Sequence, residues 1–136
     1  MIKNIITAFL LSIILFSCHS KNDNPTTAID TGRLFIRTTL DGNFNDAEDL
    51  LYKDTVNVEM YDSYKAFFKR LPDDTKDKYK ASDYTINKYS DLNDSTAVIN
   101  YSNSYMNRPM EIKVVKINGQ WKIDFKYTTT AGDSTN

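Results

Sequence analysis

The sequence is poor in residues that form covalent and metal cross-links, with a single cysteine, Cys18, and a single histidine, His19, among its 136 residues. One cysteine excludes a disulfide within the chain, so packing alone has to stabilise a folded domain. A tetrahedral metal site needs about four ligands, and adjacent side chains point in different directions. The same geometry argues against a Cys–His nucleophile. We therefore expect no metal, no cofactor and no catalytic residue at this pair.

An excess of charge of either sign is also lacking. Lys and Arg number 17, Asp and Glu number 18, and the formal net charge is −1 at pH 7. A protein that binds nucleic acid carries clustered Lys and Arg, which contact the phosphates. The sequence contains no basic stripe of this kind. We therefore expect no nucleic acid among its partners.

Long apolar runs are confined to the N-terminus, where the stretch Ile5–Phe16 follows the positive charge of Lys3. A charged start and a short apolar run are typical of a secretory signal, whereas a membrane-spanning helix needs about 20 apolar residues. The run ends in LFSC at residues 15–18, which resembles the bacterial lipoprotein box. An aliphatic residue lies three positions before the cysteine and a small residue directly before it. The resemblance implies that residues 1–17 are a signal peptide and that Cys18 carries a lipid such as palmitate.

A lipidated Cys18 would anchor the protein to a membrane of the bacterial cell envelope. No acidic run follows it, which favours a domain facing the periplasm, with exposure at the cell surface left open. Polar composition predicts that residues 18–29 form the lipidated cysteine and a flexible tether. Small polar residues predict a disordered tail over 129–136. Residues 30–128 are then one domain.

Helical periodicity accounts for the first half of this domain. Apolar spacings of three and four predict one helix from Asp30 to the glycine at Gly42 and a second over residues 44–51. A broad apolar stripe predicts a third helix, which Pro72 interrupts. The residues of this stripe are Met60, Tyr61, Tyr64, Phe67, Phe68 and Leu71. Asp73 and the residues after it predict a fourth, polar helix.

After the fourth helix the apolar period changes to two. Alternation predicts strands over 83–92, 95–105, 109–117 and 120–127. Asn118-Gly119 between the last two is the strongest short hairpin signal, because both residues tolerate the positive φ of a type I′ turn. The order predicts an α+β fold, in which N-terminal helices pack on a curved antiparallel sheet of about four strands.

The last strand sets an apolar face against a charged one. We expect its apolar residues to meet the third helix, with the first helix closing the same core. The residues expected to face inward are Leu34, Phe35, Tyr64, Phe67, Phe68, Trp121, Ile123 and Phe125. The residues expected to face outward are Lys122, Asp124 and Lys126. A cavity in this core would hold no ionised carboxylate, because Asp62 and Glu111 fall on the polar sides of their elements.

Two stretches together resemble a known family. FIRTTLDGNFNDAEDLL has a helix, a turn with Gly42 and a second helix opened by Phe44 and Ala47. IKVVKINGQWKIDF has a hairpin with a tryptophan just after the turn. The pattern resembles small bacterial lipoproteins with a nuclear transport factor 2-like (cystatin-like) domain, a family of otherwise unknown function. The resemblance implies a cone-shaped fold that leaves a pocket.

Three functions stay open at this point. The absence of a catalytic signature favours a non-catalytic domain that binds a small molecule. A pocket enzyme, isomerase- or dehydratase-like, would need a tuned carboxylate or histidine beside a tyrosine. A structural or inhibitory partner of another envelope protein is the third, and a homodimer is left open. The candidate pocket residues are Phe35, Tyr64, Phe67, Phe68, Tyr101, Trp121 and Phe125.

Overall fold

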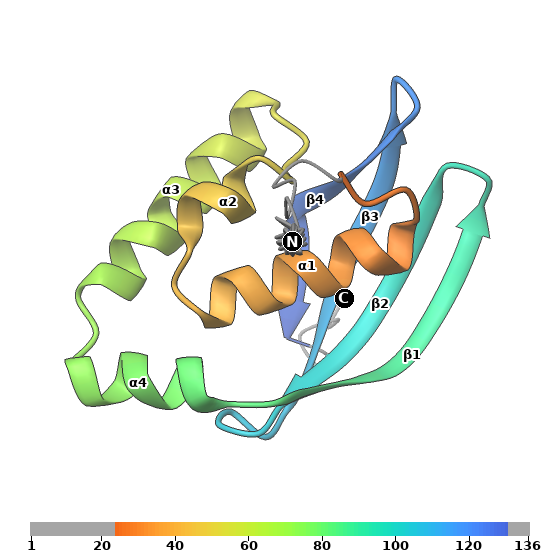
Figure 1. The fold of residues 1–136 in the computed structure, drawn as a ribbon. Helices are drawn as coiled ribbons and strands as arrows, with labels where there is room; N and C mark the ends of the chain where they lie inside the picture. The colour runs from red at the N-terminus through yellow and green to blue at the C-terminus, as the bar shows by residue number, and fades with distance from the viewer. Residues whose placement is uncertain (1–23, 131–136) are drawn as a thin grey trace, which may run out of the picture.

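The computed structural model describes residues 24–130, in which four helices precede four strands (Figure 1). The helices are α1 (Ala28–Leu40), α2 (Phe44–Glu48), α3 (Thr55–Lys69) and α4 (Asp73–Ala81). The strands are β1 (Tyr84–Asn93), β2 (Thr96–Asn103), β3 (Pro109–Ile117) and β4 (Gln120–Thr130). The predicted α+β order is confirmed. The signal peptide, Cys18 and parts of the tether and tail lie outside the described residues.

The four strands pair in chain order as an antiparallel sheet that does not close into a barrel. Ile99 pairs with Ile112, and Val114 pairs with Ile123, and none of the four is exposed. These pairs form the centre of the apolar face. At the turn between β3 and β4, φ is 49° at Asn118 and 79° at Gly119, as a type I′ hairpin requires. The predicted hairpin is therefore confirmed.

Helix α1 lies across the apolar face, and the sheet curves around it (Figure 1). It contacts all four strands, and Phe35 and Ile36 are buried beneath it. The approach is close at Gly32, where a Cβ would lie 2.1 Å from Cδ1 of Ile99. Glycine at this position therefore allows the helix to approach the sheet.

The outer edge of β4 is covered by the segment that joins α2 to α3. Tyr52 donates its N–H to the carbonyl of Ile123 at 2.9 Å, and Ile123 donates to the carbonyl of Leu50 at 2.8 Å. Further along, the side-chain oxygen of Asn57 accepts the backbone N–H of Lys126 at 2.8 Å. Edge-strand groups that would otherwise be unpaired thus have partners within the chain, and α3 is fixed against the sheet.

Two elements extend beyond the predicted limits of the domain. Helix α1 starts at Ala28, inside the predicted tether, because the Thr27 hydroxyl accepts the N–H of Asp30 and caps the helix. Strand β4 runs to Thr130, which pairs with Met110. This end lies beyond the predicted limit at residue 128, because backbone pairing continues where the apolar pattern has stopped.

Three side chains lie on the opposite side from the one predicted. Leu34 is 41% exposed and Phe67 is 52% exposed, so neither belongs to the core. Consecutive helical residues are about 100° apart, and in each case the neighbouring phenylalanine takes the inward position. Asp124 was expected on the outer face and is instead only 5% exposed. Asn57 of α3 covers it and donates to its carboxylate at 3.2 Å.

Candidate functional site

Aromatic rings from the helices and the last strand pack together between α3 and the sheet. Phe44 lies 4.8 Å from Phe68 and 5.7 Å from Tyr64, measured between ring centroids. Tyr64 lies 5.7 Å from Phe125, which in turn lies 6.2 Å from Phe35. Such tilted and edge-to-face contacts are the preferred geometries of packed rings. Three of the predicted pocket residues, Phe35, Tyr64 and Phe125, therefore contact one another, and Phe44 links Phe68 to them.

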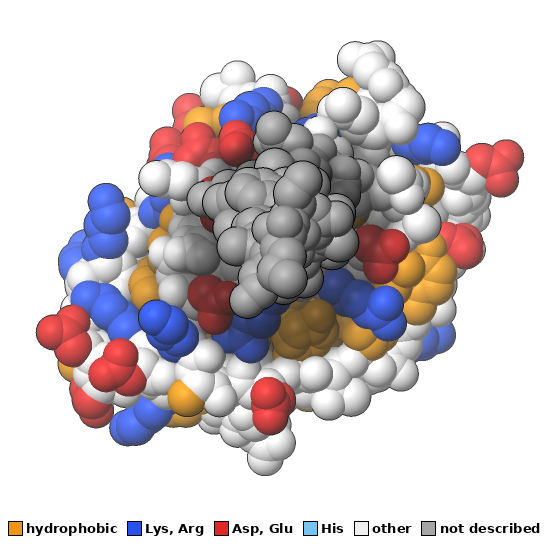
Figure 2. All heavy atoms as spheres, viewed as in Figure 1, with side chains coloured by type: hydrophobic (Ala, Val, Ile, Leu, Met, Phe, Trp, Pro, Cys, Tyr) orange, Lys and Arg blue, Asp and Glu red, His pale blue; other side chains and the backbone are white. Residues whose placement is uncertain are grey.

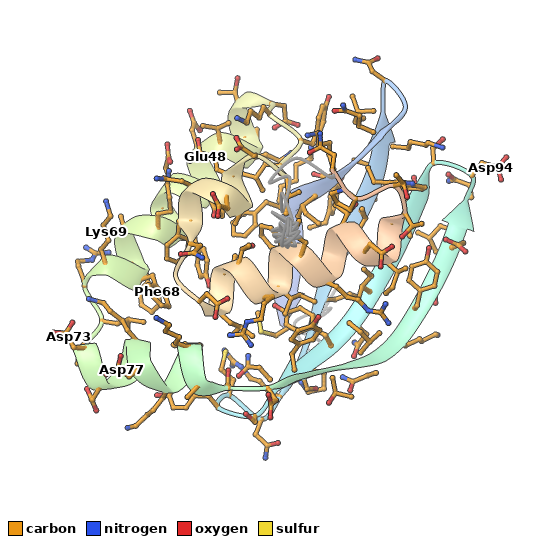
Figure 3. The ribbon with its side chains drawn as sticks, viewed as in Figure 1. Glu48, Phe68, Lys69, Asp73, Asp77 and Asp94 are labelled. Carbon is orange, nitrogen blue, oxygen red and sulfur yellow. The ribbon has the colours of Figure 1, made fainter. Side chains whose placement is uncertain are left out.

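Two of the predicted pocket residues lie away from this cluster. Phe67 faces solvent, whereas the adjacent Phe68 is buried. Figure 3 shows Phe68 pointing from α3 toward the interior and Lys69 pointing away. Trp121 is only partly buried and packs at the margin of the core, because it directly follows the exposed hairpin turn. The other five, Phe35, Tyr64, Phe68, Tyr101 and Phe125, lie in or against the core.

Three tyrosines in or next to this cluster come from three different elements: Tyr64 from α3, Tyr79 from α4 and Tyr101 from β2. We call them the tyrosine group. Burial raises the pKa of Tyr64 to about 12, and proximity to Tyr79 contributes to that shift. Burial also raises the pKa of Tyr101 above its ordinary range, and Tyr64 and Tyr79 add to the effect. At physiological pH these hydroxyls are therefore neutral.

A neutral phenol can donate one hydrogen bond and accept others. The nearby Tyr61 hydroxyl uses this capacity structurally, since it donates to the carbonyl of Phe44 at 2.9 Å. Among the described residues, no hydrogen bond engages the hydroxyls of the tyrosine group. Within residues 24–130, these hydroxyls therefore keep hydrogen-bonding capacity for water or a ligand. Tyr79 was missed from the sequence, because it is the single aromatic residue of a strongly polar helix.

A second cluster, which we call the β4-edge network, joins the start of α3 to β4. The ammonium of Lys126 donates to the carboxylate of Asp54 at 2.8 Å and lies 3.2 Å from that of Asp124. The hydrogen bond from Lys126 lowers the pKa of Asp54, and the bond to Asp54 raises the pKa of Lys126. Asn57 completes the network through Asp124 and the Lys126 backbone. These contacts hold the start of α3 against β4.

The carboxylates considered from the sequence lie at the surface. Asp62 is 57% exposed and is 2.9 Å from the ammonium of Lys65, which also binds Glu48 at 2.7 Å. These two carboxylates raise the pKa of Lys65, with Glu48 the larger contributor. Glu111 lines a shallow surface hollow with Val98 and Asn100. None of these carboxylates belongs to the aromatic cluster.

The visible surface and the comparisons give no further assignment. Lys, Arg, Asp and Glu side chains intermingle over α3 and α4 on the face shown in Figure 2. Within residues 24–130, no group of three or more His, Cys, Asp or Glu side chains could hold a metal ion. No helix in this same range is long and apolar enough to cross a membrane.

Neither a family model nor a curated protein matches the chain.

Proposed function

We propose that this protein is a bacterial envelope lipoprotein, anchored through Cys18, whose domain binds a small molecule without transforming it. The domain would have the cone shape of nuclear transport factor 2-like (cystatin-like) proteins, with the tyrosine group at its binding site. The ligand would combine an apolar body with a polar group. A bound envelope protein is the alternative occupant.

The tyrosine group is the observation that carries this proposal. Three elements contribute its rings: Tyr64 packs on Phe44 and Tyr79 packs on Phe68, and Tyr101 is buried in β2. Neutral hydroxyls suit recognition of a ligand carbonyl, hydroxyl or amide, and apolar walls suit the rest of the ligand. With pKa values raised by burial, these phenols are poor general bases at neutral pH. The arrangement therefore favours binding over proton abstraction.

The buried carboxylate does not alter this preference. A pocket enzyme of the isomerase type would use a carboxylate directed at its ligand. Asp124 is buried, but Asn57 and Lys126 both engage it from the edge of β4. Its charge is thereby balanced within the β4-edge network, and its role is to hold α3 on the sheet.

The binding proposal can be tested by identifying what the purified protein retains. The full protein is extracted from bacterial membranes in mild detergent and then denatured, and the released compounds are profiled by mass spectrometry. Tyr101→Phe removes one hydroxyl from the site and should reduce the amount of a released compound. Tyr127→Phe, at a position that is 51% exposed, is the matched control and should leave it unchanged. Equal release from both variants and the wild type would contradict a role for the tyrosine group.

The anchor is tested separately by metabolic labelling with an alkyne-bearing fatty acid. Cys18→Ala removes the thiol and should abolish the label. Ser17→Ala keeps a small residue before the cysteine and should retain it. Label that persists in Cys18→Ala would show that this residue is not the lipid attachment site.

A further inference from the structure

The start of the described chain and the tip of the β3–β4 hairpin lie next to each other. Asn24, Pro25 and Thr26 line one hollow together with Leu50 and residues 119–122. A neighbouring hollow continues along the hairpin to Tyr52, Lys53 and Ile117. We call this surface the hairpin face. Its residues are Tyr52, Lys53, Lys116, Ile117, Trp121 and Lys122.

The length of the tether places this surface near the anchor. Asn24 follows Cys18 by six positions, and an extended chain spans at most about 3.3–3.6 Å per residue. A lipidated Cys18 in a bilayer surface therefore holds Asn24 within roughly 20 Å of that surface. This distance is shorter than the breadth of a domain of about 100 residues, whose radius of gyration is about 13 Å. The tether therefore excludes orientations in which the side that carries Asn24 lies farthest from the lipid.

The chemistry of the hairpin face suits the boundary between lipid and water. Tryptophan and tyrosine are enriched at that boundary, where an apolar ring and a polar atom are both accommodated. The ammonium of Lys116 lies 5.4 Å from the centroid of the Trp121 ring. A lysine of this kind keeps its charge available to a headgroup while its stem covers apolar surface.

The charge of the hairpin face complements an anionic headgroup. Lys53, Lys116 and Lys122 contribute three positive charges. Asp49 adjoins them, with its carbonyl 2.9 Å from the Lys122 ammonium and its carboxylate 3.8 Å from that of Lys53. Asp94 follows at the tip of the β1–β2 turn, where Figure 3 shows it pointing away from the sheet. Three lysines against two aspartates leave a positive surface.

We propose that the hairpin face rests on the anionic phospholipid surface to which the protein is anchored, with Trp121 at the level of the headgroups. This inference rests on the lipid anchor at Cys18 put forward under the proposed function. It sets the orientation of the domain, so that the C-terminal end of α3, with its exposed Phe67, lies away from the bilayer (Figure 1). The membrane is thus a binding partner of the folded domain as well as of its lipid.

The sole tryptophan of the chain makes this orientation measurable. The full lipidated protein is reconstituted into vesicles that contain phosphatidylglycerol, with or without phospholipids brominated near the headgroup end of the acyl chain. Bromine quenches tryptophan only at short range, so we expect the brominated lipid to reduce Trp121 emission. In the double variant Trp121→Phe, Phe67→Trp, the only tryptophan lies on α3, and its emission should stay unchanged.

Each outcome bears on the inference in a different way. Quenching at position 121 and not at position 67 supports it, whereas the reverse pattern overturns it. Protein that floats with the vesicles but shows no quenching at either position overturns the docking while leaving the anchor intact. Protein that does not float contradicts the anchor, and the docking fails with it.

The charge contribution is tested with Lys116→Gln, Lys122→Gln in the same vesicles. A lysine near an anionic surface favours binding by about fivefold, so the ratio of docked to undocked domain should fall by roughly 25-fold. Replacing exposed Lys69 on α3 and exposed Lys88 on β1 with Gln is the matched control and should leave the quenching unchanged. Quenching that is equal in the two double variants would overturn the role of anionic lipid.

Discussion

Replacing Gly32 with alanine should destabilise the protein, although alanine is the better helix former. In the interior of a helix, alanine is favoured over glycine by about 1 kcal/mol. The new Cβ would lie 2.1 Å from Cδ1 of Ile99, where carbon atoms prefer about 3.5–4.0 Å. Overpacking of a filled core typically costs about 1–3 kcal/mol. The overlap at 2.1 Å is severe, so we expect a net loss of up to about 2 kcal/mol in the free energy of unfolding, measured by urea denaturation.

The same reasoning predicts a specific rescue. Ile99→Val removes Cδ1 and leaves Cγ1 at 3.6 Å from the new methyl, which is an ordinary contact. Alone, this change should cost about 0.5–1.5 kcal/mol, but together with Gly32→Ala it should cost less than the sum of the two. Ile112→Val is the control, because its Cδ1 is already 3.4 Å away and there is less overlap to relieve. A stabilised Gly32→Ala protein, or single effects that simply add, would refute the packing of α1 on the sheet.

Three further predictions concern the turn and the β4-edge network. Gly119→Val should lower the free energy of unfolding by about 1 kcal/mol or more, seen as a lower urea midpoint, because φ is 79° there, whereas Gly119→Asn should be tolerated. Asn57→Ala should cost about 1–3 kcal/mol by leaving the Lys126 N–H without its acceptor, and an unchanged midpoint would mean that the edge of β4 finds another partner. Asp54→Asn is tested by measuring the free energy of unfolding as a function of pH. The pKa of Asp54 is lower in the folded protein than its ordinary value of 3.8, so the ionised carboxylate stabilises the fold at pH values above 3.8. This stabilisation is lost as the pH falls through the pKa of the folded protein. The gap between wild type and variant should therefore be constant near neutrality and shrink below about pH 4; a gap that persists in acid would contradict the ion pair.

Local signals were enough to predict the elements and the final turn. Helical spacing identified α1 and α3, and the Asn118-Gly119 pair identified the hairpin that the structure shows. Both depend on residues close together in the chain, whose preferences do not need the rest of the fold. The element ends at Ala28 and Thr130 were not predicted, because side-chain capping and backbone pairing set them.

The composition of the site could be predicted only in part. A broad apolar stripe shows that α3 packs against something, but it does not say whether Phe67 or Phe68 faces the sheet. Asp124 is buried by Asn57, which is 67 positions away in the sequence, so alternation along β4 alone places it outside. Tyr79 reaches the tyrosine group because the turn after α3 directs α4 so that the Tyr79 ring lies 5.6 Å from the Phe68 ring, measured between centroids. Such long-range contacts depend on tertiary packing, which the local pattern does not contain.

The most direct test of the account is the mass of the protein taken from bacterial membranes, measured under native and then denaturing conditions. The denatured mass should equal that of a chain beginning at Cys18 plus its lipid. The native mass should exceed the denatured mass by that of one retained small molecule, and Tyr101→Phe should lose this excess. A chain without lipid at Cys18, or a native mass equal to the denatured mass, would contradict an anchored binding protein.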